Sequence, residues 1–374
     1  MLIHGIFPWI FVLHLKGFMN FNNFFLRSFR ILLFPFALIY GIILKVRNYL
    51  YDKEYIRSTA FNIPIINVGN LSVGGTGKSP MVDYLVSMLK FEYKVGTLSR
   101  GYKRRTHGYL LAGNDTTAVE LGDEPMQFHM RHPEIAVAVG EERIVAVPQL
   151  LYDKPETQVI ILDDAFQHRA ITPGFNILLT DCNNLYTRDF YLPTGDLRDN
   201  VSSARRANII IVTKCAPDLS EKEREAMIRE IDPLPGQHVF FTSIQYGRLY
   251  HIIHQSPREL MKDHEVLLVC GIANPLPLTN YIEENTNSYD AMFFSDHHIF
   301  SYDDLKEIRE RFDSLDQPDK IIVTTEKDAV RLVKYRQELK ELPFYVLPIS
   351  VRFLFNEEGE FRALISNFIR NFGK

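Results

Sequence analysis

The sequence predicts an α/β protein with a parallel sheet in its larger domain and a second, smaller α/β domain. Three observations predict this class. Short, almost wholly apolar runs alternate with helical patterns, as strands of a sheet covered on both faces do: "KVGTLSR", "IAVAVG", "VIILDDA", "NILLTDC" and "NIIIVTK". A glycine-rich segment separates the Ile- and Val-rich run "IPIINVGNL" from the helical pattern "PMVDYLVSMLK". Two further strand-and-turn units, "EVLLVCGIANP" and "KIIVTTEKDAV", follow residue 254.

Length and charge set limits on the function. With 374 residues and 46% hydrophobic side chains, the chain can build two cores of ordinary size. A net charge of −4 gives no basic footprint, so nucleic acid is not an expected partner. Cys182, Cys215 and Cys270 show no C-x-x-C spacing, which predicts neither a disulfide framework nor a zinc site and fits a reducing compartment.

The first residues resemble a signal peptide or a membrane span, but they lack a basic leading region and a small-residue cleavage site. Met19 follows "MLIHGIFPWIFVLHLKGF" directly. We therefore expect residues 1–18 to be an over-extended start, with the natural chain beginning at Met19.

The next segment, residues 31–44, reads "ILLFPFALIYGIIL" and is shorter than the ~20 apolar residues that a bilayer span needs. Cations bracket it at Arg27, Arg30, Lys45 and Arg47. This pattern predicts a monotopic helix in the headgroup region of an anionic leaflet, within an N-terminal segment 1–50. A buried helix packed on the core is the alternative.

The glycine-rich segment reads "SVGGTGKS" and matches the P-loop pattern G-x-x-x-x-G-K-[ST] except at its first position, which is Ser72. Its strand-to-helix context is the one that a P-loop requires. Backbone N–H groups and the helix N-terminus would cradle phosphates, Lys78 would reach the terminal phosphates, and Ser79 would hold Mg²⁺. The expected nucleotide contacts are Ser72, Val73, Gly74, Gly75, Thr76, Gly77, Lys78 and Ser79.

A basic stretch, "SRGYKRRTHG" at residues 99–108, places Arg100 and Tyr102 after a strand of the same sheet. Such a run is usually a solvated surface. After a strand of the P-loop sheet, it is also suited to an anionic substrate group or to lipid headgroups. Both interpretations stay open.

The segment "LGDEP" places Asp123 and Glu124 in a turn before "MQFHM", where we expect a helix to start. The two acids would favour a helix N-terminus electrostatically. In a kinase, a carboxylate near the γ-phosphate can instead accept the proton of the attacking hydroxyl. Spacing alone does not choose between these roles.

The strand "VIILDDAFQH" ends in Asp163 and Asp164, where a P-loop fold places the acid that holds Mg²⁺. Capping of the following turn is the other interpretation. His168 follows closely and is a candidate ligand, base or orienting hydrogen-bond partner. By contrast, "NIIIVTKC" lacks the Asp of the GTPase pattern N-K-x-D, so Lys214 receives no role.

Two long, aromatic-rich stretches, 238–253 and 344–353, are expected to pair as a two-stranded linker. They divide the chain into a P-loop domain (51–237), a smaller α/β domain (254–343) and a C-terminal helix (354–374) that packs back on one of the two domains.

In the smaller domain, "FFSDHHIFSYDDL" sets Asp296, His297 and His298 before a helix expected to begin near Tyr302. Adjacent residues of a strand point to opposite faces, so at most one of the two histidines is expected in a given site. A histidine that works with a carboxylate is the favoured functional interpretation.

Eight motifs together resemble one family: "VGNLSVGGTGKSP", "LSRGY", "GDEP", "DDAFQH", "LPTGDLRD", "CGIANP", "DHH" and "TTEKDAV". The chain resembles the tetraacyldisaccharide 4′-kinases, the lipid A 4′-kinases of Gram-negative bacteria, from near residue 30 to its C-terminus. That family carries Ser or Thr where Ser72 stands. Two features depart from its pattern: Ala165 replaces a glycine, and "GDLRD" replaces "GPLRE".

The resemblance implies an ATP- and Mg²⁺-dependent transfer of phosphate to the 4′-hydroxyl of a tetraacyldisaccharide 1-phosphate, forming lipid IVA in lipopolysaccharide biosynthesis. It implies two α/β/α domains with the site in the cleft between them. Asp123 would be the base, with His297 as its dyad partner once the domains close. Lys78 and Ser79 would bind MgATP, with Asp163, Asp164 and Glu124 near the metal; Arg100, Tyr102 and His168 would lie on the substrate side.

The resemblance also implies partners and a location: a lipid disaccharide substrate, the inner-leaflet surface, no obligate protein partner, and peripheral attachment to the cytoplasmic face of the inner membrane. Two other functions remain open on the residues. A membrane-attached P-loop switch or partitioning ATPase would carry Lys where Val73 stands. A soluble small-molecule kinase would have no use for the apolar N-terminal segment.

Overall fold

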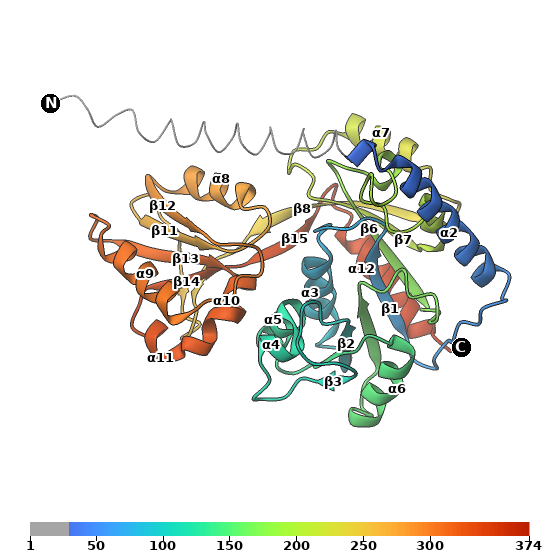
Figure 1. Ribbon diagram of the computed structural model, residues 1–374, viewed down its shortest axis with the longest axis horizontal. Coiled ribbons are helices and arrows are strands. Elements are labelled where there is room, and N and C mark those ends of the chain that lie inside the picture. Colours follow the sequence, from blue (N-terminus) through green and yellow to red (C-terminus); the bar gives the residue numbers. More distant parts are fainter. Residues whose placement is uncertain (1–29, 374) are drawn as a thin grey trace.

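The structure is a computed structural model that describes residues 30–373 (Figure 1). The proposed over-extended start, Met19 and Arg27 lie outside these residues. Nine strands form the larger sheet: β1 (Ile65–Asn70), β2 (Val95–Ser99), β3 (Leu110–Leu111), β4 (Ala136–Val139), β5 (Val159–Asp163), β6 (Phe175–Asp181), β7 (Ile209–Thr213), β8 (His238–Tyr246) and β15 (Ile349–Phe353). Six strands form the smaller sheet: β9 (Leu249–His251), β10 (Pro257–Arg258), β11 (Glu265–Cys270), β12 (Ser288–Phe293), β13 (Lys320–Thr325) and β14 (Phe344–Leu347).

The larger sheet has the order β15-β8-β7-β6-β1-β5-β2-β4-β3. Its strands from β8 to β4 pair in parallel, and the two edge strands β15 and β3 are antiparallel. The apolar runs that predict a parallel sheet form its buried strands, so the predicted α/β class is confirmed. Strands β5 and β6 flank β1, so the strand order reverses at β1. Open α/β sheets bind ligands beyond the C-terminal ends of the strands at such a point.

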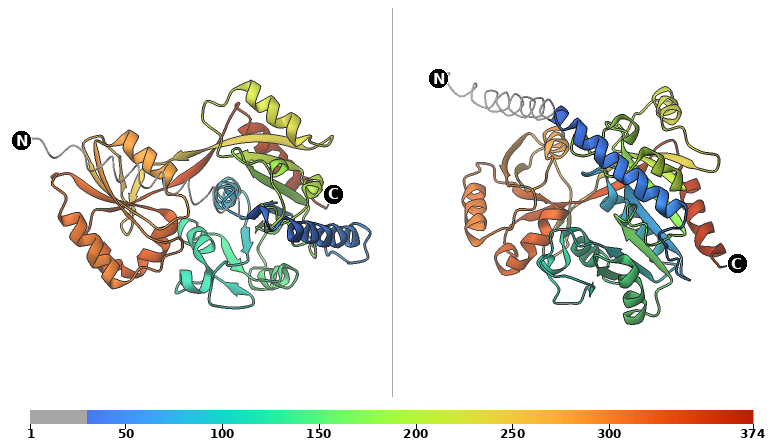
Figure 2. Two further views of the ribbon diagram at one scale, coloured as in Figure 1. Left: turned by 45° about the horizontal axis from the view of Figure 1, so that its top comes forward. Right: turned by 45° about the vertical axis from the view of Figure 1, so that its right-hand side comes forward.

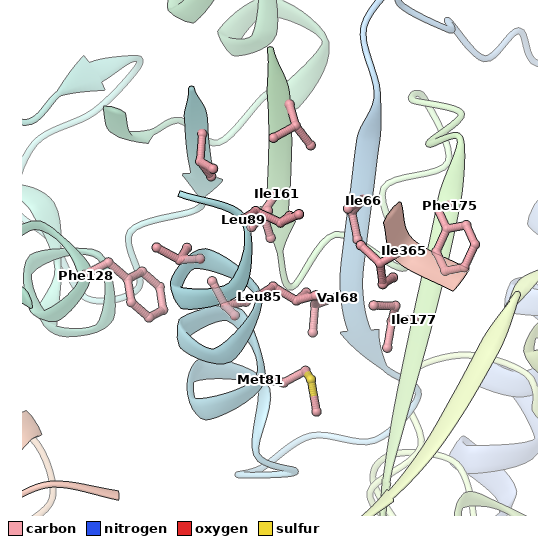
Figure 3. Close-up of a cluster of buried hydrophobic side chains, with 14 of the residues drawn as sticks. Ile66, Val68, Met81, Leu85, Leu89, Phe128, Ile161, Phe175, Ile177 and Ile365 are labelled. Carbon is pink, nitrogen blue, oxygen red and sulfur yellow. The ribbon is translucent and has the colours of Figure 1, made fainter. Parts of the chain in front are cut away.

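Helices cover both faces of this sheet. On one face, α3 (Lys78–Leu89) directs Met81, Leu85 and Leu89 into a cluster with strand residues, and Phe128 of α5 (Asp123–Arg131) joins it (Figure 3). The C-terminal helix α12 (Glu358–Asn371) contributes Ile365 to the same cluster, so it packs on the larger sheet. The opposite face buries residues of α6 (Arg143–Asp153) and α7 (Glu221–Ile231). A short helix, α4 (Ala118–Leu121), precedes α5.

Two pairs of strands connect the sheets, as the long aromatic-rich stretches lead one to expect. Strand β8 pairs antiparallel with β15, and β9 pairs antiparallel with β14. One difference is that β8 also pairs in parallel with β7 through its first residues, His238 to Phe241. The expected linker is therefore continuous with both sheets, and β8 and β15 run between them in Figure 1.

The smaller sheet has the order β10-β9-β14-β13-β11-β12, and its four strands from β14 to β12 are parallel. Helix α8 (Leu276–Asn285) buries residues on one face, and α9 (Tyr302–Asp313) buries residues on the other. Helices α10 (Glu326–Leu332) and α11 (Arg336–Leu339) lie on the face that α9 covers. The two views of Figure 2 show the smaller sheet beside the larger one, with α10 on the side of the smaller sheet that faces the larger sheet.

The N-terminal helix α2 (Phe34–Asp52) has two unlike faces. Its buried residues, Ala37, Gly41, Leu44 and Asn48, recur at helical spacing and lie against the segment before β7. A side chain at position 41 would clash with the Tyr191 ring, which an added Cβ would approach to 2.7 Å.

The other face of α2 exposes apolar side chains: Phe36, Leu38, Ile39, Ile42, Ile43 and Val46. The helix therefore packs on the protein along one face and exposes the other. Within residues 30–373, no helix has the length and apolarity to cross a bilayer.

Candidate active site

The glycine-rich loop joins β1 to α3 at the reversal point of the larger sheet. Gly77, with a φ of 83°, turns the chain into the first turn of α3, so Lys78 and Ser79 begin the helix. Gly74 has a φ of 102°, and a Cβ added at Gly74 or Gly75 would meet no atom within 4 Å. The loop therefore faces open space, and the N–H groups at the start of the helix have no intrahelical partner. This is the arrangement expected of an anion site.

Neighbouring segments hold the loop in place. Asn70 Nδ2 donates to Thr76 Oγ1 at 2.8 Å, and Thr213 Oγ1, at the end of β7, donates to the Thr76 carbonyl at 2.9 Å. On the other side, the Val73 N–H donates to the Asp196 carbonyl at 2.7 Å. Lys214, the next residue after Thr213, forms an ion pair with Asp181 at 2.8 Å.

The two carboxylates at the end of β5 lie next to the loop, because β5 pairs with β1. Burial raises the pKa of Asp163 to about 7, and the charge of Asp164 adds to the shift. Asp163 Oδ1 is buried without a hydrogen-bond partner among the described residues. Asp164 has a φ of 54°, accepts from Arg198 Nη1 at 3.1 Å and lies 3.9 Å from Lys78 Nζ. Burial opposes ionisation of Asp164, but the charges of Lys78 and Arg198 outweigh it and lower its pKa.

The "GDEP" segment begins a helix rather than preceding one. We expected the helix at "MQFHM", but α5 starts at Asp123. Gly122 has a φ of 99° and packs so closely on Gly101 that an added Cβ would lie 3.2 Å from the Gly101 Cα. Pro125 fits in the first turn because no intrahelical hydrogen bond is needed there. The helix start thus presents Asp123 and Glu124 side by side toward the smaller sheet.

The "DHH" segment meets Asp123 from the other sheet. His297 Nδ1 lies 2.7 Å from Asp123 Oδ2, although 174 positions separate the two residues in the chain. His298 turns away and pairs with Asp304 at 2.9 Å. We expected at most one of the two histidines in a given site because adjacent strand residues point to opposite faces, but these two residues do not lie on a strand. The pair lies in a turn closed by the His298 N–H and the Ser295 carbonyl, where His297 has a φ of 62°. We expected His297 to approach Asp123 when the two domains close. In this structure the two side chains are in direct contact.

Helix α10 completes this cluster with two cations that the sequence analysis did not assign. Lys327 Nζ lies 3.3 Å from His297 Nε2 and 3.6 Å from Glu124 Oε1. One turn further on, Arg331 Nε lies 3.6 Å from Asp123 Oδ2. At the other end of the interface, Arg131 contacts Glu326 at 2.9 Å. Ion pairs at both ends of α5 therefore join it to α10.

The three predicted substrate-side residues lie around the two clusters. Tyr102 is 61% exposed, and its ring centroid lies 5.8 Å from that of His297. Burial and the nearby charge of Arg143 lower the pKa of His168 to about 4, and Arg100 adds to this shift. His168 is therefore neutral at physiological pH. Arg100 is exposed and lies on the same side of the sheet as the β5 carboxylates.

Arg198, Lys327 and Arg331 are the site residues that sequence reasoning missed. A signal existed for the last two: Lys327 and Arg331 stand four positions apart, so they share one face of a helix that follows a strand end. For Arg198, the only sequence signal was its place in the "LPTGDLRD" motif, whose fold the pattern does not reveal.

Comparison with known proteins gives consistent results. A family model described as tetraacyldisaccharide-1-P 4′-kinase matches residues 29–370. A protein named tetraacyldisaccharide 4′-kinase from Bacteroides thetaiotaomicron is 42% identical over 352 residues, which is 90% of this chain and 93% of that protein. Its namesake from Flavobacterium johnsoniae is 43% identical over 91% of this chain and 97% of its own length. A solved structure described as "apo" LpxK from Aquifex aeolicus in complex with ATP superposes with a TM-score of 0.72 at 28% identity, covering 91% of this chain and 99% of that one.

Proposed function

The chain belongs to the tetraacyldisaccharide-1-P 4′-kinase family, and from that premise we propose a role for each residue of the site. The activity is the transfer of the γ-phosphate of ATP to the 4′-hydroxyl of a tetraacyldisaccharide 1-phosphate, a step of lipid A biosynthesis. The attacking sugar oxygen bonds to phosphorus, the bond to the ADP oxygen breaks, and the hydroxyl proton must go to a base on the protein.

The P-loop binds the donor. Its open face and the first turn of α3 supply N–H groups for the phosphates, and the partly buried Lys78 supplies a point charge. Among residues 30–373, no group of three or more His, Cys, Asp or Glu side chains stands ready to hold a metal ion. Mg²⁺ needs fewer protein ligands, because it keeps waters and binds through one or two carboxylates plus substrate phosphates.

The residues present therefore fit Mg²⁺. The Oδ1 atom of buried Asp163, which has no hydrogen-bond partner among the described residues, would be an oxygen ligand, and the Ser79 hydroxyl lies in the adjacent first turn of α3. Asp164 and Glu124 add negative charge near it. When bound, Mg²⁺ neutralises the charge of the β- and γ-phosphates.

Asp123 is the proposed base, and its contacts indicate which of its two carboxylate oxygens accepts the proton. Among residues 30–373, the two side-chain partners of this carboxylate, His297 Nδ1 and Arg331 Nε, both lie at Oδ2. Oδ1 is therefore the oxygen suited to accept the 4′-hydroxyl proton. The His297 contact fixes the carboxylate orientation. Arg100, Tyr102 and the neutral His168 are proposed to line the substrate side, where Tyr102 lies beside the His297 ring.

The observation that carries this proposal is the contact of Asp123 and His297 across the two sheets. The direct test is phosphate transfer from radiolabelled ATP to purified tetraacyldisaccharide 1-phosphate in detergent micelles. Product carrying the label at the 4′-position is expected. Hydrolysis of ATP at an equal rate with and without the lipid would instead indicate a switch ATPase.

We also propose the division into a P-loop domain (51–237), a smaller domain (254–343) and the linker 238–253 with 344–353, because each sheet has its own buried clusters. The lipid substrate and the exposed face of α2 support attachment of this helix to the inner-leaflet surface. Of the bracketing cations, Lys45 is exposed and suited to anionic headgroups, whereas Arg30 and Arg47 bind protein groups and anchor the helix.

Replacing Phe36, Ile39 and Ile43 together by Ser should release the enzyme from membranes. These exposed residues share one stripe of α2, and burial of each such side chain is worth about 1.5–3 kcal/mol when complete. We expect the partition coefficient onto vesicles that contain anionic lipid to fall at least about tenfold, measured by co-sedimentation.

The matched control changes three exposed apolar residues elsewhere, Phe91, Val145 and Tyr152, to Ser. It should leave vesicle binding unchanged. Equal loss in both triple variants would mean that general surface apolarity, rather than α2, attaches the enzyme.

A further inference from the structure

The Nε2 atom of His297 faces a cation. Lys327 Nζ lies 3.3 Å from this nitrogen, and a lysine ammonium has three donors and no acceptor. Nε2 must therefore accept the hydrogen bond. Within residues 30–373, the only other polar side-chain atom near it, Asp296 Oδ2, lies at 3.6 Å, which is beyond hydrogen-bond distance.

This contact determines where the imidazole proton is. A neutral imidazole carries one N–H, and the hydrogen bond made by one ring nitrogen sets the state of the other. With Nε2 accepting, the proton is on Nδ1, and Nδ1–H donates to Asp123 Oδ2 at 2.7 Å. We propose that Lys327 is a positioning residue for phosphoryl transfer, which holds His297 in the Nδ1–H tautomer that orients Asp123. The proposal rests on the proposed role of Asp123 as the base.

The structure holds Lys327 firmly in this position. Glu124 Oε1 and Asp296 Oδ1 flank its ammonium at 3.6 and 3.8 Å. The next residue, Asp328, is fully buried and fastens the start of α10, because its Oδ2 accepts from Thr325 Oγ1 at 2.7 Å and from the Gly271 N–H at 3.1 Å. Without Lys327, the other tautomer would direct a nitrogen lone pair at the Asp123 carboxylate and repel it.

A double-mutant cycle tests whether Lys327 acts through His297. Lys327→Met keeps the length of the side chain and removes the donor. We expect kcat to fall roughly 10–100-fold, the range typical for partners that orient a functional histidine, with little change in the KM for ATP. In a His297→Ala background, Lys327→Met should leave kcat unchanged, because the group through which it acts is already gone.

Two controls accompany the cycle. Lys306→Met removes an exposed lysine of α9 in the same domain and should keep wild-type kcat. Lys327→Arg keeps a donor and a charge near Glu124, so it should retain most of the activity. Circular dichroism shows which variants are folded.

Nitrogen NMR of the wild-type enzyme, labelled with ¹⁵N-histidine, gives an independent readout that needs no folded Lys327 variant. The His297 signals, identified by their loss in His297→Ala, should show a protonated Nδ1 and an unprotonated Nε2. A proton on Nε2 in the wild-type enzyme would overturn the proposal. So would an equal loss of kcat from Lys327→Met in both backgrounds, which would place Lys327 on the phosphate or the fold instead. Either failure leaves the role of Asp123 intact, which its own substitution tests.

Discussion

Replacing Asp123 by Asn is expected to lower kcat by about 10²–10⁴-fold, the usual contribution of a general base. Asn keeps the size of the side chain, and its oxygen can still accept from His297 Nδ1, but it cannot take the hydroxyl proton. The KM for ATP should change little, because the proposed donor site is the P-loop and not α5. The measurement is the initial rate of 4′-phosphorylation, with circular dichroism to confirm folding.

The control for this result is Asp115→Asn, which removes an exposed carboxylate before α4 and should have wild-type activity. Combining Asp123→Asn with His297→Ala should be scarcely worse than Asp123→Asn alone, because groups that act as one unit are not additive. Multiplicative losses would mean that the two residues act independently. Near-normal turnover of Asp123→Asn would transfer the role of base to Asp164 or His168.

The second large effect is expected at the P-loop. Lys78→Ala removes the point charge proposed to meet the terminal phosphates, and loss of one such group at the transition state costs about 10²–10³-fold in kcat. The fold should survive, because Lys78 occupies the partly buried first turn of α3 and lies outside the hydrophobic cluster to which Met81, Leu85 and Leu89 of that helix belong. Initial rates and thermal unfolding measure the two consequences separately.

Lys94→Ala, at an exposed site before β2, is the matched control for loss of one positive charge. If Lys78→Ala retained wild-type turnover, the loop would not be the phosphate site. If instead both variants lost activity equally, general electrostatic attraction of ATP would explain the result.

Local patterns in the sequence were sufficient for the parallel sheet and the P-loop. Strands such as β5 and β7 are buried on both faces, so their composition alone reveals them. Likewise, a Lys-Ser pair at the end of a glycine loop is found in few structures other than a P-loop. The resemblance to a family was needed to join Asp123 to His297, because no local pattern reports a contact across 174 positions.

Local patterns failed where tertiary contacts decide the structure. The start of α5 at Asp123 depends on the close approach of Gly101 to Gly122, which involves two separate segments. Lys327 and Arg331 received no role in the sequence analysis. They are site residues only because α10 packs against α5 of the other sheet.

The order of the strands has a consequence for synthesis on the ribosome. The smaller sheet is encoded between β8 and β15, and both β15 and α12 belong to the larger sheet. Residues such as Phe361 and Ile365, buried in the same cluster as Ile66 and Val68 of β1, are therefore made after the whole smaller sheet. The inserted part can fold while the nascent chain is still growing, whereas the P-loop core stays open on one face until the last helix leaves the exit tunnel.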